Sequence, residues 1–182
     1  LSAEDPVSFA YSKGVTMGSD ILESDGKAPS FFVWALRDIK RAPLDRVQII
    51  KGWTEVSGRT YEKVFDVACS WGIAPDPETH RCANNGAKVN LDNCEISKNV
   101  GSNELKTIWK DPEFNPSIKA FYYVRVLENP TCRWSTWDAI KSGNKPRADV
   151  APTIQERAWS SPIWYVPNNR GLAAVNILPD EI

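Results

Sequence analysis

The sequence contains a single histidine, His80, among 182 residues. Serine and cysteine nucleophiles commonly use a histidine base that a third group orients. His80 stands between Thr79 and Arg81 in a polar stretch, a position typical of a surface histidine. The sequence therefore predicts no catalytic residue of its own.

Clusters of metal-ligating residues are also missing from the sequence. A zinc site of the usual composition would have to combine His80 with Cys82 and Cys94, and the His-x-Cys spacing does not match a zinc finger or ribbon. A calcium loop needs acidic ligands and a glycine that the nearby polar residues do not supply; these residues are Asn90, Asp92 and Asn93. We therefore expect no metal site and no cofactor in this chain.

Positive and negative charges are nearly balanced, since 22 basic and 23 acidic residues give a net charge of -1. Without a basic stripe the chain has nothing to neutralise a nucleic-acid backbone. No apolar run approaches the roughly 20 residues of a membrane-spanning helix, and no basic-then-apolar leader opens the sequence. We expect neither a nucleic-acid partner nor a membrane span.

The four cysteines are an even number and favour two disulfides: Cys69, Cys82, Cys94 and Cys132. Cys82 and Cys94 flank a polar stretch without apolar periodicity, and a bridge between them would close a short loop worth about 3 kcal/mol. Cys69 would then pair with Cys132, while the other two pairings stay open. Two bridges indicate a periplasmic or secreted protein. Four reduced thiols, packed as small apolar side chains, are the alternative.

The distribution of β-branched and aromatic residues predicts a mostly β fold. In residues 61–69 the apolar Phe65 and Val67 alternate with Glu62 and Asp66, which predicts a half-buried strand with both acids on its outer side. With 13 prolines, most of them between the runs, the pattern indicates a β-sandwich, immunoglobulin-like or similar, with one or two short helices. The expected strands are residues 31–37, 46–53, 61–69, 104–109, 120–127 and 162–166.

The chain has the length of about one domain. We place this domain at residues 26–167, after a peripheral segment at 1–25 and before a tail at 168–182. The predicted helix begins at Ser135, which would cap with Asp138 at the reciprocal position, and ends before Gly143. Residues 153–156 show the same helical pattern, but the segment is long enough for only a single turn.

Tryptophan is the residue type in clearest excess, with eight in the chain. Large rings inside strand runs usually belong to the core, so Trp34, Trp109 and Trp164 are expected there. For three others the sequence allows either packing in the fold or a flat platform for sugar rings: Trp134, Trp137 and Trp159.

Arg125 is the one charged residue in the apolar run at residues 121–127. A buried arginine needs a carboxylate partner, and Asp66 or Glu128 is the expected one. We interpret this pair as structural.

Several stretches of the sequence carry a family resemblance. They are KGV at residues 13–15, MG at 17–18, LDRVQIIKGW at 44–53, EKVFDVA at 62–68, WKDP at 109–112, AFYYVRVLE at 120–128 and QERAWSSPIWY at 155–165. Together they resemble the carboxy-terminal third of the domain of unknown function (DUF) 3604 family, from about residue 13 to residue 167. The last stretch is the most specific. Thr16 and Ser19 depart from the family, which often has proline and glycine there.

The resemblance implies a larger, often exported parent. Its amino-terminal part would resemble the PHP (polymerase and histidinol phosphatase) superfamily of metal-dependent phosphoesterases, and the divalent metal is expected there. None of the His- and Asp-rich metal motifs occurs in this sequence. The chain would then be a non-catalytic carboxy-terminal lobe of a phosphoesterase or related ester hydrolase. Its partner would be the amino-terminal catalytic domain of the same parent, on which it would pack and whose cleft it would shape.

The polar and aromatic residues that strand packing explains least are candidates for the cleft or for docking: Lys13, Asp20, Arg133, Trp134, Glu156 and Arg157. Ordinary surface ion pairs and helix caps are the alternative for each of them. A function of another class stays open as well. A stand-alone carbohydrate-binding or adhesion module would use the open tryptophans as its platform, and a parallel pair of exposed rings would favour it.

Overall fold

The longest strand, β3 (Leu44–Thr54), lies inside a sheet of six strands. It pairs antiparallel with β4 (Thr60–Cys69) on one side and with β6 (Ala120–Glu128) on the other. The other edge of β6 pairs with β10 (Ile163–Tyr165) and, further along, with β9 (Arg157–Trp159). The short β1 (Asp20–Ile21) adds parallel to β10. The computed structural model describes residues 5–22 and 26–167.

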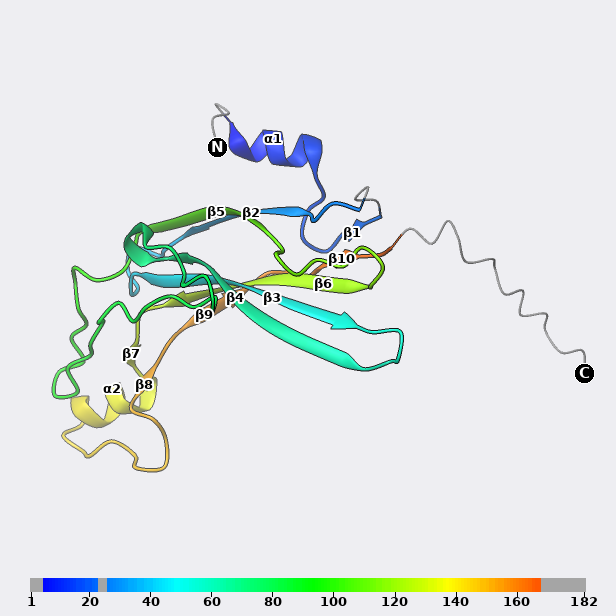
Figure 1. The fold of residues 1–182 in the computed structure, drawn as a ribbon. Helices are drawn as coiled ribbons and strands as arrows, with labels where there is room; N and C mark the ends of the chain where they lie inside the picture. The colour runs from blue at the N-terminus through cyan, green and yellow to red at the C-terminus, as the bar shows by residue number, and fades with distance from the viewer. Residues whose placement is uncertain (1–4, 23–25, 168–182) are drawn as a thin grey trace, which may run out of the picture.

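A second layer covers one face of this sheet. Strands β2 (Ser30–Leu36) and β5 (Glu104–Lys110) form an antiparallel pair along their full length, and Figure 1 shows them above β3, β4 and β6. Their inner side chains pack on those of the large sheet. The buried core consists of Phe31, Val33, Leu44, Val47, Ile49, Phe65, Val67, Leu105, Ala120, Tyr122 and Tyr165. The predicted mostly β, sandwich-like fold is therefore confirmed.

The remaining elements lie around the two layers (Figure 1). Helix α1 (Pro6–Lys13) is capped by Asp5 and contains no buried residue. A one-turn 3-10 helix, η1 (Ser70–Gly72), follows β4. Strands β7 (Thr131–Cys132) and β8 (Thr153–Ile154) pair beside helix α2 (Trp134–Lys141). Within the described residues, no helix has the length and apolar character needed to cross a membrane.

The six expected strands all form, with ends that differ by no more than two residues from the prediction. The predicted helix also forms, but its capping is different from the expectation. Arg133 is the N-cap residue and gives no side-chain cap, while Gly143 has the left-handed φ of 69° that the prediction required. Residues 153–156 do not form the expected helical turn, because Thr153–Ile154 form β8 and the next two residues belong to no helix or strand. Both α1 and β1 lie in the segment at 1–25, and the tail at 168–182 lies outside the described residues.

The two disulfides exist, but the preferred pairing was wrong. Cys69 bonds Cys82 and Cys94 bonds Cys132, each with 5.6 Å between the Cα atoms. The segment after η1 folds back along β4, where the Asp66 amide donates to the His80 carbonyl oxygen at 2.9 Å. This return brings Cys82 to the end of β4, next to Cys69, and so Cys94 is left to bond β7. Two disulfides are consistent with an oxidising compartment.

The polar stretch between Cys82 and Cys94 does not need its own bridge because its side chains organise its turns. The Asn84 side-chain oxygen accepts from the Gly86 amide, and the Asn90 oxygen accepts from the Asp92 amide, both at 2.8 Å. Such Asx turns hold a loop without apolar packing.

Candidate functional site

Two consecutive polar residues of β3, Asp45 and Arg46, turn toward each other. On a regular strand neighbouring side chains point to opposite faces. Here the register with β6 shifts between Leu44 and Arg46, and such a bulge re-aims side chains. The Arg46 Nε donates to Asp45 Oδ2 at 2.9 Å, and Asp45 is buried at 5% exposure. The bulge thus places an ion pair at the end of the large sheet.

Asp66 on β4 completes this ion pair from the neighbouring strand. Its side chain is fully buried and accepts from Arg46 Nη1 at 2.9 Å, from Gln48 Nε2 at 2.6 Å and from the Cys82 amide at 2.7 Å. Burial by itself would lower the pKa of Arg46, but its hydrogen bonds and charge interactions with Asp45 and Asp66 outweigh burial and raise it. The network holds Arg46 charged and in one orientation.

The sequence prediction of an outward Asp66 was therefore wrong, because the returning segment at residues 73–82 covers that side of β4. The expected partner of Arg125 was wrong as well. Its Nε donates to the Gln48 side-chain oxygen at 2.7 Å, so Gln48 links Arg125 to Asp66 without a direct ion pair. His80, expected at the surface, is half-buried with its ring 5.0 Å from that of Phe65.

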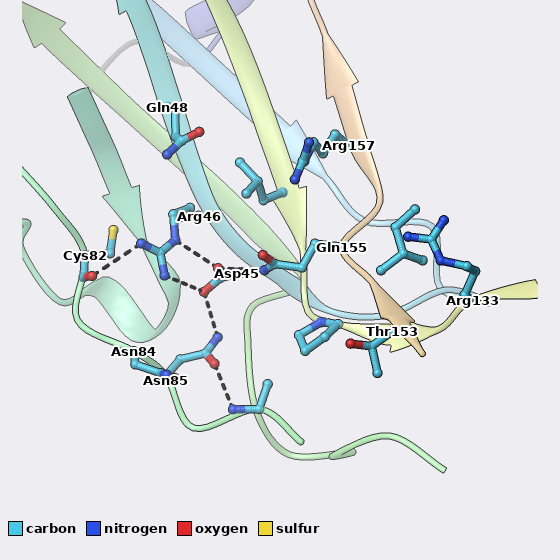
Figure 2. Close-up of a pocket in the computed structure, with 14 residues that line it drawn as sticks. Asp45, Arg46, Gln48, Cys82, Asn84, Asn85, Arg133, Thr153, Gln155 and Arg157 are labelled. Atoms are coloured by element: carbon cyan, nitrogen blue, oxygen red, sulfur yellow. Dashed lines mark hydrogen bonds and ion pairs between the residues drawn. The ribbon is translucent and has the colours of Figure 1, made fainter. Parts of the chain in front are cut away.

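An open pocket of about 660 Å³ lies beside this network. Figure 2 shows Cys82 and Asn85 on one side of it and Arg133 and Arg157 on the other. Gln155 reaches between them, donating to Asp45 Oδ2 at 3.2 Å and to the Glu128 carbonyl oxygen at 3.1 Å. The lining consists of Asp45, Arg46, Gln48, Cys82, Asn84, Asn85, Ala87, Leu127, Pro130, Arg133, Thr153, Ile154, Gln155 and Arg157. We call it the arginine pocket.

Both disulfides help to build the arginine pocket. Cys82 belongs to its lining, and its carbonyl oxygen accepts from Arg46 Nη1 at 3.3 Å. Cys132 directly precedes Arg133, and its bond to Cys94 ties β7 to the polar loop that carries Asn84 and Asn85. The walls of the pocket thus come from distant parts of the chain that are joined covalently.

The structure places two of the six candidate residues predicted from the sequence in the pocket and the other four elsewhere. Arg133 and Arg157 line the arginine pocket. The other four are exposed and lie outside its lining: Lys13 at the end of α1, Asp20 on β1, Trp134 at the start of α2 and Glu156 before β9. The prediction missed the polar residues of β3. Arg46 and Gln48 stand two residues apart inside an apolar run, and this spacing was the available signal that one strand face is polar.

A second surface lies next to the pocket, on the face of the large sheet that points away from β2 and β5. Strand register places Trp164 opposite Phe121, and Trp159 opposite Arg125. The Phe121 ring lies 5.2 Å from the Trp164 ring and 6.3 Å from the Tyr123 ring, centroid to centroid. We define these four aromatic residues as the open face: Phe121, Tyr123, Trp159 and Trp164.

The tryptophans are more exposed than the sequence predicted. Trp34 and Trp164, expected in the core, are 43% and 47% exposed, whereas Trp109 does pack against the core. Strand residues alternate between two faces, and both rings lie on the faces that the sandwich does not cover. The three undecided rings are also exposed: Trp134, Trp137 and Trp159. In the part of the chain that the structure describes, none of these three contacts another aromatic ring.

A separate buried cluster lies on the core side of the large sheet. Lys51 Nζ contacts Asp111 Oδ2 at 2.5 Å and donates to the Glu113 carbonyl oxygen at 2.7 Å. The Tyr122 hydroxyl donates to the same carboxylate, and burial with this hydrogen bond raises the pKa of Tyr122. Each of these groups has its partner inside the cluster, so the cluster fixes the segment after β5 to the sheet.

The arrangement of the pocket suits binding. Across residues 5–22 and 26–167 no group of three or more His, Cys, Asp or Glu residues is placed to hold a metal ion. The pocket offers guanidinium and amide groups, which donate hydrogen bonds to a ligand's oxygen atoms. These donors can therefore bind and orient a ligand.

Comparison with known proteins supports the family resemblance. The chain matches the family described as "Protein of unknown function (DUF3604)" over residues 1–167. No curated protein and no solved structure matches it. The match extends over the whole sheet system, both helices and the arginine pocket. The chain belongs to the DUF3604 family.

Proposed function

We propose that this chain is the non-catalytic carboxy-terminal lobe of a larger, periplasmic or secreted PHP-like metal-dependent hydrolase. In this proposal the lobe packs on the catalytic domain of the same parent through the open face, and the arginine pocket borders the cleft. The parent would act on a phosphoester or a related ester. The observation that carries the proposal is the open face itself.

The outer face of an antiparallel sheet is ordinarily polar where water covers it. The open face instead carries four aromatic residues, of which Trp159 and Trp164 are 58% and 47% exposed. Contiguous exposed apolar surface in a folded domain marks an interaction site. The Phe121 ring also lies directly over Gly52, where an added Cβ would be 2.2 Å from its Cζ. This packing holds the ring in place before any partner binds.

The borders of the open face define the chemistry of its partner. Arg125 lies opposite Trp159 by strand register, Arg157 stands two residues before Trp159 on β9, and neither arginine forms an ion pair within the described residues. A matching surface would be apolar at its centre with carboxylates at one edge. That edge adjoins the arginine pocket, so a catalytic domain docked there would have the pocket beside it.

The proposal is tested by binding and by activity. The lobe and the remaining part of its DUF3604 parent are expressed separately and mixed, and their association is measured by calorimetry. The double variant Trp159→Ser/Trp164→Ser should lose about tenfold or more in affinity, because exposed aromatic anchors dominate such interfaces. Trp34→Ser is the matched control, since Trp34 is similarly exposed on the other layer and Lys106 lies over its ring.

Hydrolysis assays with phosphate and sulfate esters and added divalent metals test the proposal that the parent is a metal-dependent hydrolase and this lobe is non-catalytic. The parent should be active and the lobe alone inactive. Metal-dependent hydrolysis by the lobe alone would overturn the proposal, as would unchanged association of the double variant.

The alternative is a stand-alone carbohydrate-binding module, and the exposure of Trp134 at 73% is the observation that favours it. A flat exposed ring can stack on a sugar. Binding of the lobe to neutral polysaccharides, lost in Trp134→Ala and retained in Trp164→Ala, would support this function over docking.

A further inference from the structure

Two guanidinium groups of the arginine pocket lack an acidic partner. Arg133 Nε donates to the Ala151 carbonyl oxygen at 2.9 Å, and this neutral contact leaves its two terminal nitrogens available. The Arg157 side chain makes no hydrogen bond or ion pair with any described residue, although its backbone pairs with β6. Arg46 is different, because Asp45 and Asp66 both neutralise it. The pocket therefore contains two positively charged side chains that no acidic group of the described residues neutralises.

The acidic groups near the pocket are already occupied. Asp45 accepts hydrogen bonds from Arg46, Asn85 and Gln155. Asp66 lies behind Arg46, away from the lining, and accepts from several donors at once. The lining itself contains three arginines and one carboxylate. An approaching anion therefore meets a net positive pocket whose carboxylate is engaged by neighbouring side chains.

Neutral donors stand beside these arginines. The Asn84 side-chain oxygen accepts from the Gly86 amide, which leaves the Asn84 amide nitrogen without a partner among the described residues. Thr153, on β8, adds a hydroxyl group to the lining. Guanidinium, amide and hydroxyl donors together match the oxygen atoms of a phosphate, sulfate or carboxylate group.

We propose that the arginine pocket binds an oxyanionic group of a small organic ligand through Arg133 and Arg157, with Asn84 and Thr153 as neutral donors. The two arginines approach from different elements, since Arg133 directly precedes α2 and Arg157 begins β9. A pocket of about 660 Å³ has space for a ligand larger than the oxyanion alone. The identification of this ligand as the parent's substrate rests on the proposed function. Binding of the oxyanionic group by this chain does not depend on that function.

The test is a calorimetric titration of the chain at low ionic strength with four probes: inorganic sulfate, inorganic phosphate, glucose 6-sulfate and neutral glucose. The charged probes should bind, and higher salt should weaken them. Arg133→Gln and Arg157→Gln should each weaken binding about tenfold, since each removes a charge-assisted hydrogen bond. Arg59→Gln is the matched control, because Arg59 is exposed beside Tyr61 at the far end of β4 and should leave affinity unchanged.

The probes also separate the sources of the oxyanion. Tighter binding of glucose 6-sulfate than of sulfate supports an organic ligand, and equal affinities contradict that part of the proposal. If neither arginine variant weakens the binding of sulfate, the result is an adventitious ion only, and the proposal is overturned. Tighter binding of neutral glucose than of the charged probes would overturn it as well. Loss of docking in the Trp159→Ser/Trp164→Ser variant with intact sulfate binding separates the two proposals, because only docking requires the open face.

Discussion

Arg46 on β3 donates a hydrogen bond from Nη1 to the buried carboxylate of Asp66 on β4, at 2.9 Å. This contact joins two strands and lies behind the lining of the arginine pocket, and Asp66 also fixes the returning segment through the Cys82 amide. Asp66, with three close donors around its carboxylate, has little room for substitution.

We expect Asp66→Asn to destabilise the protein by about 3 kcal/mol. The variant keeps the size of the side chain but removes its charge, so Arg46 loses one of its two carboxylates and one amide nitrogen faces other donors. Denaturant unfolding measures the loss. Asp149→Asn is the control, because Asp149 pairs with Arg147 at the surface, where a single ion pair adds little stability, and the variant should unfold almost as the native protein does. Equal losses in the two variants would contradict a structural role for Asp66.

Removal of the longer disulfide should cost more than removal of the shorter one. The sequence separations are 38 residues for Cys94–Cys132 and 13 for Cys69–Cys82. Loop-closure entropy in the unfolded chain predicts about 4 and about 3 kcal/mol respectively for the two Cys→Ala pairs. Thermal unfolding of both double variants tests the order. Peptide mapping without reductant checks the pairing itself, and a peptide linking Cys82 to Cys94 would disprove it.

Gly52→Ala should destabilise the large sheet by about 1–3 kcal/mol, because the new methyl group would overlap the Phe121 ring. Phe121→Leu in the same chain should recover part of this loss by making room at the site. A double-mutant cycle of unfolding free energies measures the coupling. Strictly additive effects would mean that the ring does not pack on Gly52.

Glu128→Gln should change how stability depends on pH. Burial raises the pKa of Glu128 above 4.5, with Arg41 opposing and Glu156 adding to the shift. A group with a raised folded-state pKa contributes stability below its unfolded pKa and loses it as pH rises through the folded value. The native protein should therefore lose more stability than the variant as the pH rises above about 4.5, the ordinary pKa of the carboxyl group. Parallel unfolding curves over this range would contradict the shift.

The sequence allowed six strands to be predicted because their signals are local. Apolar and aromatic runs with turn residues at their ends specify the five long strands β2 to β6, and the three-residue β10 is marked by the prolines on either side of its aromatic residues. The strands that were missed have two or three residues: β1, β7, β8 and β9. Segments so short carry no periodicity, and they pair only because a longer strand or a disulfide lies beside them.

The candidate site was predicted less well than the fold. Arg133 and Arg157 were singled out as polar residues that strand packing did not explain, and both line the pocket. Asp45, Arg46 and Gln48 were not singled out. Asp45 and Arg46 meet because a bulge shifts the register of β3 against β6, and Gln48 joins them only through Asp66 on the neighbouring strand.

Composition and local pattern determined that this chain is mostly β, contains two disulfides and has a single histidine. Tertiary structure alone decided which cysteines bond, which side of β4 is covered, which tryptophan rings remain exposed and which arginines stay without acidic partners. The physical reason is that strand propensity acts between residues adjacent in the chain. Disulfides, ion pairs and burial depend on distances between segments that are remote in sequence.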